Sequence, residues 1–187
     1  PTNKIRLAID KESIIKNNVV SPKQYDSIVP YIDIDIKGRA LYKNRLMMLD
    51  LIANNNWKRP IYFSGGAYDD EDFLWMKNYL QLDGMTYKLV PIKTEIPKDA
   101  SPLEMGGIDT DKMYANVMKW DWGNSESLSI YHDPETRKNS ITYRSYLSRL
   151  MNQLILEGKK EKAKNIITLA MNKMPLEQFG YYSLLEP

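Results

Sequence analysis

The chain of 187 residues contains no cysteine, only one histidine and no long apolar run. Without cysteine it has no disulfides, thiolate zinc sites or thiol nucleophiles, an absence that fits cytoplasm and periplasm alike. The single His132 excludes a metal site built from several histidines of this chain. No stretch of about 18 apolar residues and no signal sequence is present. We expect no catalytic residue, no metal and no cofactor in this chain. Its start at Pro1, without an initiator methionine, is compatible with an excised piece or a processed product.

An excess of charge of one sign is also missing. Lysine and arginine number 26 against 24 aspartate and glutamate, a formal net charge of +2. Because nucleic-acid binding depends on a concentrated positive surface, this balance argues against a nucleic-acid partner. Hydrophobic residues make up 43% of the chain, which is ample for a sizeable core.

Two kinds of hydrophobic pattern divide the chain. Apolar residues alternate with polar ones at residues 5–9 and 32–36, as in half-buried strands, and recur at helical spacing later. The fold class predicted is α/β or α+β, a small sheet with packed helices followed by a helical hairpin. The expected division is an α/β layer at 1–94, a proline- and glycine-interrupted linker at 95–108 and a helical region at 109–187, all packed as one unit.

Several further elements follow from periodicity and breakers. A short helix is expected at 11–15, a buried strand at 61–63, a returning strand at 87–92 and a helix from Asp109 to about residue 119. A helix through Phe73 to Leu80 is expected to end at Gly84. Residues 125–140 are polar and turn-rich. The helix over 41–53 is expected to carry Tyr42, Leu46, Leu49 and Ala53 on one apolar face, with Met48 and Ile52 beside it.

The last part of the chain resembles one tetratricopeptide repeat, at about residues 144–177. Gly158 falls in the turn of a 34-residue frame that starts at Arg144, and Pro175 falls at its end. The apolar positions of the frame are Leu147, Leu150, Leu154, Ala163, Ile167 and Ala170. One repeat cannot bury both of its faces, so this hairpin must dock on the rest of the chain or on a partner.

Acidic and glycine-rich segments offer candidate chemistry but fit simpler roles. Ser64-Gly65-Gly66 precedes the expected helix like a phosphate loop, yet the acidic run 69–72 would repel phosphate and suits the positive end of a helix. Asp33 and Asp35 share a strand face and are candidate paired carboxylates for acid/base work on a glycosidic bond. Alternating exposed acids are commonplace on such strands. His132 beside Asp133 is interpreted as a surface turn before Pro134.

Aromatic residues near element ends are the more suggestive feature. Indole rings at such places can leave a flat apolar face on which a sugar or a protein partner stacks, although core packing is the commoner role for any single ring. Arg59 stands close enough to Trp57 to stack on it or to pair with the acidic run. The candidate binding residues are Trp57, Arg59, Tyr62, Trp120, Trp122, Asn124 and His132.

The most specific string of the chain is residues 55–63, Asn-Asn-Trp-Lys-Arg-Pro-Ile-Tyr-Phe. Together with Tyr79-Leu80, Gly84, residues 87–91 and residues 109–124, it resembles the soluble C-terminal region of certain bacterial multi-pass membrane proteins. They form a domain-of-unknown-function family whose membrane part is similar to the protein O-mannosyltransferases of the GT-C glycosyltransferase class. The resemblance covers most of residues 41–187.

The resemblance implies a periplasmic domain tethered to the inner membrane by preceding transmembrane segments. Its implied partner is the membrane-embedded part of its own parent chain, a lipid-linked-sugar transferase, with an acceptor protein or glycan as a further partner. No position of this chain corresponds to the catalytic loop of such a transferase.

Three hypotheses follow from the sequence. The first is a non-catalytic accessory domain that recognises protein or glycan for a membrane-bound glycosyltransferase-like protein. The second is a stand-alone tetratricopeptide-type module that binds peptide in an exposed groove of its hairpin. The third is an acid/base glycosidase-like enzyme that uses Asp33, Asp35 or the acidic run.

Overall fold

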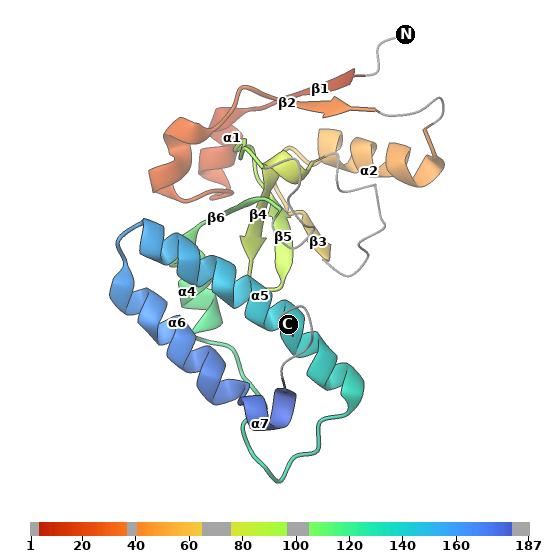
Figure 1. Ribbon diagram of the computed structural model, residues 1–187. Coiled ribbons are helices and arrows are strands. Elements are labelled where there is room, and N and C mark those ends of the chain that lie inside the picture. The colour runs from red at the N-terminus through yellow and green to blue at the C-terminus, as the bar shows by residue number, and fades with distance from the viewer. Residues whose placement is uncertain (1–3, 37–40, 65–75, 97–104, 181–187) are drawn as a thin grey trace. The chain divides into compact units, whose positions relative to one another are not determined.

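The computed structural model describes residues 4–36, 41–64, 76–96 and 105–180. Contacts within the chain divide it into two compact units, residues 1–109 and residues 110–187. The first unit holds two small sheets with helices and the second is helical (Figure 1), so the mixed α/β class with a C-terminal helical region is confirmed. Among the described residues, no helix is long and apolar enough to cross a membrane.

The first sheet is a two-stranded antiparallel ribbon of β1 (Lys4–Ala8) and β2 (Tyr31–Asp35). Ile32 and Ile34 are fully buried, while alternate residues face outward, as the period-two pattern predicts. Between the strands lie α1 (Lys11–Lys16), confirmed as a short helix, and the 3₁₀ helix η1 (Pro22–Ser27). The Asp10 carboxylate caps α1 by accepting the backbone N–H groups of Glu12 and Ser13.

The second sheet has the strand order β3-β5-β4-β6. Its strands are β3 (Tyr62–Ser64), β4 (Leu80–Asp83), β5 (Thr86–Leu89) and β6 (Gly107–Ile108). The two central strands, β4 and β5, are buried on both faces, and β6 pairs with β4 in parallel. A side chain at Gly106 would lie 2.3 Å from the Leu80 carbonyl oxygen, so glycine is needed for β6 to approach β4.

Three expectations for the first unit are corrected. The helix expected to end near Leu80 is wrong over its described part, because Lys77–Tyr79 forms the 3₁₀ helix η2 and Leu80 opens β4. Gly84, with φ +69°, makes the two-residue turn of the β4–β5 hairpin instead of ending a helix. The strand over 61–63 is an edge strand with Tyr62 46% exposed, not a buried one. The phosphate-loop glycines Gly65 and Gly66 and the acidic run 69–72 lie outside the described residues.

The helix α2 (Lys43–Asn54) turns only one edge of the predicted apolar face inward. Leu49 and Ile52 are buried, whereas Tyr42 and Leu46 are 67% and 56% exposed. Counting apolar residues on a helical wheel fails here because this helix is apolar around most of its circumference, and the tertiary environment chooses the buried stripe.

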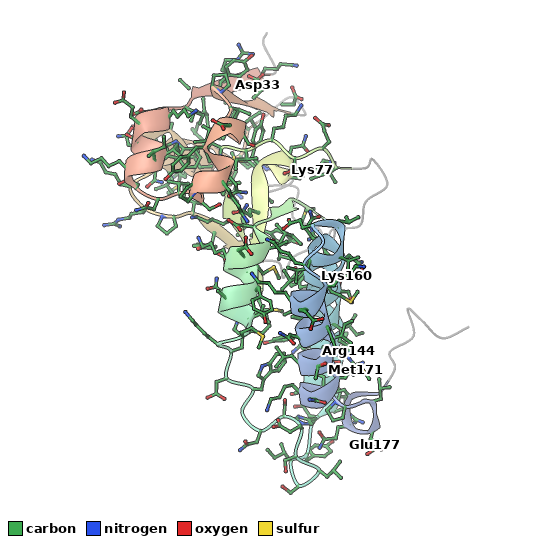
Figure 2. All side chains as sticks on the ribbon, turned by 90° about the vertical axis from the view of Figure 1, so that its left-hand side faces the viewer. Asp33, Lys77, Arg144, Lys160, Met171 and Glu177 are labelled. Carbon is green, nitrogen blue, oxygen red and sulfur yellow. The ribbon has the colours of Figure 1, made fainter. Side chains whose placement is uncertain are left out.

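The second unit consists of α4 (Thr110–Val117), α5 (Pro134–Leu156), α6 (Lys160–Lys173) and the short α7 (Leu176–Phe179). Helices α5 and α6 lie side by side (Figures 1 and 2), joined by a turn in which Gly158 has φ +74°. Their contact buries Leu147, Leu150, Leu154, Ala163 and Ile166. Ile167, expected inside, is 46% exposed and its neighbour Ile166 is buried instead. The tetratricopeptide character of this pair stays a prediction.

Helix α5 begins ten residues before the expected start of the hairpin. Asp133 is its N-cap and accepts the backbone N–H groups of Glu135 and Thr136, and Pro134 occupies its first turn. The Asp133-Pro134 pair therefore opens a helix and not a surface turn, which also corrects the turn-rich interpretation of residues 134–140.

Two polar clusters fasten the helices of the second unit. The Lys159 ammonium lies 2.8 Å from carboxylate oxygens of Asp111 and Glu157, and the Thr110 hydroxyl donates to Glu157 at 2.6 Å. These contacts tie the start of α4 to the α5–α6 turn. The Arg144 guanidinium, labelled on α5 in Figure 2, donates to the carbonyl oxygens of Met174 and Gly180 at 2.8 and 2.9 Å. It therefore holds the end of α6 and α7 against α5.

Candidate functional site

The turn that leaves α2 has unusual backbone geometry at two consecutive residues. Asn56 and Trp57 have φ values of +47° and +56°, and the Lys58 N–H donates to the Asn55 carbonyl oxygen at 3.0 Å. Positive φ at both central residues with this hydrogen bond is the pattern of a type I′ turn. Asparagine tolerates the left-handed region, but tryptophan rarely adopts it, so the backbone at Trp57 is strained.

Neighbouring contacts hold this strained turn in place. The Asn55 side-chain amide donates to the Arg59 carbonyl oxygen at 2.7 Å and so links the two ends of the turn. The half-buried Trp57 ring packs on a buried apolar cluster. The residues of this cluster lie in α1, in the segment that follows α1 and directly after β5. The cluster consists of Ile14, Val19, Val20 and Val90. Packing of the indole therefore offsets the backbone strain at Trp57.

An open pocket of about 520 Å³ lies beside this turn, a size typical of small-molecule sites. Its walls come from β1, the start of α1, the end of α2 and the turn itself. The lining residues are Arg6, Leu7, Ala8, Ile9, Asp10, Ser13, Ile52, Ala53, Asn56, Trp57 and Lys58. Apolar and polar groups are mixed, so the pocket can offer both an apolar surface and hydrogen bonds to one ligand.

Two charged groups of the pocket, those of Arg6 and Asp10, already hold structural partners. Arg6 donates to both carboxylate oxygens of Asp33, at 2.7 and 2.9 Å, and lies 3.7 Å from the centre of the Tyr31 ring. Asp10 accepts the Ser13 hydroxyl at 2.6 Å, a bond that lowers the pKa of Asp10 together with the capped backbone N–H groups. Both side chains are therefore fixed and ionised near neutral pH.

The paired-carboxylate hypothesis does not fit this geometry. The Arg6 guanidinium holds the pKa of Asp33 below its usual value, and Asp35 lies 3.4 Å from the Lys4 ammonium. Figure 2 shows Asp33 on the strand ribbon of the first unit. Because a glycosidase general acid needs a raised pKa, Asp33 and Asp35 act as cross-strand ion-pair partners instead. Within the described ranges, no group of three or more His, Asp or Glu side chains is arranged to hold a metal ion.

The other candidates of the first unit lie outside the lining of this pocket. Arg59 is exposed at the end of the turn, where its carbonyl oxygen accepts Asn55. Tyr62 lies on the edge strand β3, and its hydroxyl donates to the Asp83 carboxylate at 3.0 Å. Partial burial, with the nearby Asp83 charge, raises the pKa of Tyr62 to about 12. Tyr62 therefore has a local structural role, and Arg59 contributes to the turn through its backbone carbonyl group.

The candidates of the second unit fall into two groups. Trp120 and Trp122 meet Tyr143 of α5, with ring centroids 5.6 to 6.1 Å apart, and form a half-buried aromatic cluster. His132 lies apart from it, with its ring 4.5 Å from that of Phe179 and its Nε2 atom 2.9 Å from the Ser125 carbonyl oxygen. The spacing of these aromatics suits core packing.

Asn124 belongs to the loop between these groups. It adopts a left-handed conformation with φ +58°, and its carbonyl oxygen accepts the Ser127 N–H at 2.9 Å. Of the seven candidates, Trp57 alone lines the described pocket. Sequence reasoning missed its companions Arg6, Asp10, Ser13 and Asn56, although the three consecutive asparagines before Trp57 are a recognisable signal for left-handed backbone.

Comparison with known families matches the part of the chain that contains this pocket. The family model described as TMEM260-associated domain 2 matches residues 1–112, which is 112 of the 187 residues. The match includes the string 55–63 but begins before residue 41 and ends within α4, so it differs in extent from the resemblance over 41–187. No curated protein and no solved structure matches the chain.

The TMEM260 family is related to the protein O-mannosyltransferases, which agrees with that resemblance at the level of the family. The pocket beside Trp57 lies wholly inside the matched residues. The chain belongs to the TMEM260-associated domain 2 family.

Proposed function

We propose that this chain is a non-catalytic accessory domain that recognises glycan or protein for a mannosyltransferase-related membrane protein. Membership of a TMEM260-associated family supports the accessory role. In this proposal the domain lies on the periplasmic side of a bacterial inner membrane, and its partner is the membrane-embedded part of its own parent chain. Transfer chemistry then belongs to that part, and this domain holds the ligand.

The pocket beside Trp57 is the observation that carries the recognition role. Trp57 lines the pocket, and in this proposal an apolar face of its indole takes the C–H groups of a sugar ring. Ser13, Asn56 and Lys58 line the same pocket, and in this proposal their side chains hydrogen-bond to the hydroxyl groups of the sugar. A hydroxyl-rich ligand with an apolar face matches this mixture better than a purely apolar one does.

The rigidity of the pocket supports binding over proton transfer. Asp10 and Arg6 are held by Ser13 and Asp33, so the pocket is preformed and little ordering entropy is lost on binding. The same contacts keep both groups ionised, which suits hydrogen bonding to a ligand more than general acid/base work at neutral pH.

The test is titration of the purified chain with mannose-type oligosaccharides, followed by NMR shifts of the Trp57 indole and the neighbouring backbone amides. We expect dissociation constants in the millimolar range, because an open pocket makes few contacts with each sugar. A millimolar constant corresponds to a binding free energy on the order of 4 kcal/mol. Trp57→Leu keeps an apolar side chain but removes the flat ring, and should abolish the shifts. Trp120→Leu, in the other unit, is the matched control and should bind as the unchanged chain does.

Saturating sugar that leaves the amides of residues 56–58 unshifted would refute glycan binding at this pocket. Shifts that persist unchanged in Trp57→Leu would place the ligand elsewhere.

The helical pair of the second unit favours one alternative, the binding of a peptide. Ile155, Leu156, Ile167 and Met171 are 46% to 80% exposed on α5 and α6, and Figure 2 marks Met171 near the end of α6. A peptide that bound the exposed apolar side chains of α6 would shift the amides of that helix, and Ile167→Gln should abolish its binding. Sugar and peptide titrations on the same sample therefore separate the two functions.

A further inference from the structure

Helix α2 carries the largest concentration of exposed apolar side chains on one described helix of the first unit. Tyr42, Leu46, Met47 and Leu51 are 67%, 56%, 58% and 67% exposed. Single exposed apolar residues are ordinary, but four on a helix of 12 residues and its N-cap form a patch that marks an interaction surface.

Two opposite charges lie along the middle of this patch. Lys43 and Asp50 are seven residues apart, so they lie two turns from each other on one stripe of the helix. Leu46 and Met47 lie between them, one on each side of that stripe. The described residues provide neither Lys43 nor Asp50 with an ion-pair partner, and the Asp50 carboxylate accepts the Asn54 amide at 2.9 Å on one oxygen.

We propose that this face of α2 binds a second copy of the same chain, with the two α2 helices antiparallel about a twofold axis between Leu46 and Met47. In that arrangement Lys43 lies opposite the partner's Asp50, and the reverse pair forms by symmetry. Leu46 and Met47 each meet their own symmetry equivalents. The stripe is therefore its own complement in both charge and apolar character.

The charges select the antiparallel direction. A parallel pairing of the same faces would bring each Lys43 beside the partner's Lys43 and each Asp50 beside the partner's Asp50, and like charges at an interface are unfavourable. The same charges disfavour a lipid surface as the occupant, because Lys43 and Asp50 lie at the centre of the face and would have to enter the apolar layer. A second copy satisfies both charges.

The dimer is expected to be weak. One helical face offers less than the roughly 800 Å² per partner that standard stable interfaces bury, so a dissociation constant on the order of 10 to 100 μM is expected. Because two ion pairs form per dimer, association should weaken as the salt concentration rises.

Sedimentation equilibrium from about 1 to about 500 μM protein tests the proposal, since that range brackets the expected constant. Lys43→Glu and Asp50→Lys each place two like-charge pairs in the interface and should weaken the dimer about tenfold or more. The double variant K43E/D50K restores opposite charges and should recover the dimer. Leu46→Gln should also weaken it, whereas Leu128→Ser, which alters a leucine 75% exposed on a loop of the second unit, should leave it unchanged.

Recovery in the charge-swapped double variant distinguishes pairing of these helices from a general effect of charge on solubility. A chain that is monomeric throughout the concentration range overturns the proposal, as does a dimer that is indifferent to either single reversal. Failure of the double variant to recover overturns the antiparallel pairing. Because the pocket beside Trp57 is titrated separately, none of these results changes the outcome of the sugar experiment.

Discussion

Replacement of Trp57 should show glycine to be better tolerated than alanine, which reverses the usual order of these two residues. The reason is the backbone at this position, where φ is +56° in a turn closed by the Lys58 N–H and the Asn55 carbonyl oxygen. Alanine removes the indole and keeps the strain of a left-handed residue. Glycine removes the indole and the strain together.

The magnitudes follow from the burial of the ring. Loss of a fully buried tryptophan costs about 3 to 5 kcal/mol, and since Trp57 is half-buried against the cluster of Ile14 and Val90, about 2 to 3 kcal/mol is expected for Trp57→Ala. Relief of the left-handed strain is worth about 1 to 2 kcal/mol, from which the greater chain entropy of glycine subtracts up to about 1 kcal/mol. Trp57→Gly should therefore be about 0.5 to 1 kcal/mol more stable than Trp57→Ala.

Amide hydrogen exchange at Leu82 and Leu89 measures this difference, because both residues lie in the buried central strands of the first unit. The control pair is Leu51→Ala and Leu51→Gly at an exposed site inside α2, measured at low protein concentration. There glycine should be less stable than alanine by about 0.5 to 1 kcal/mol. If Trp57→Gly were also the less stable of its pair, the strain argument for the turn would be wrong.

Three further predictions concern local interactions. Asp133→Ala should fray the first turn of α5, seen as a loss of helical carbon shifts at residues 134–137, whereas Asp133→Asn should keep the cap. Because the Thr136 hydroxyl and backbone lower the pKa of Asp133, this stabilisation is present at neutral pH and is lost as pH falls through that lowered pKa, a dependence that Asp133→Asn should lack. Tyr62 should ionise near pH 12 in the folded chain and near pH 10 after unfolding, which ultraviolet titration measures. The free energy of unfolding should therefore decline between these two pH values, and it should decline much less in Tyr62→Phe, as measured by urea unfolding. Arg144→Lys should lower the free energy of unfolding by about 1 to 3 kcal/mol, because hydrogen bonds to the Met174 and Gly180 carbonyl oxygens are lost. Urea unfolding measures this change, and an unchanged midpoint would show that these hydrogen bonds do not stabilise the unit.

The elements with a strict local signal were predicted well. Alternating isoleucines specified the β1–β2 ribbon, because one face of a two-stranded sheet is buried and the period of its side chains is two. The contact of α5 with α6 was likewise predicted from the spacing of Leu147, Leu150 and Leu154 and from the turn at Gly158. In each case the periodic pattern has one low-energy arrangement, so neighbours in sequence contain enough information.

Elements whose apolar residues fit two arrangements were predicted poorly. Residues 76–80 resemble the end of a helix, but the hydrogen bonds available from β5 and β6 make Leu80 the first residue of a central strand. In α2 the apolar residues occur on nearly every side, and only the contacts of Leu49 and Ile52 decide which side is inward. Asp133-Pro134 fits both a turn and a helix start, and the helix that follows makes Asp133 an N-cap.

The candidate site shows the same limit at longer range. The string around Trp57 indicated a special segment, and the family match contains it. Its companions Arg6, Asp10 and Ser13 are more than 40 positions away in sequence, and nothing in their local pattern connects them with the turn. Asp33 was a candidate acid until the cross-strand register placed Arg6 against it.

The sequence alone determined the charge balance, the lack of cysteine, the strand ribbon, the helical C-terminal region and the family resemblance, because composition and short-range periodicity are properties of the chain itself. Tertiary structure decided the buried side of α2, the partners of Asp33 and Asp10, and the pocket beside Trp57. Those features depend on segments distant in sequence coming together, and that packing is set by the free energy of the whole core and not by any one segment.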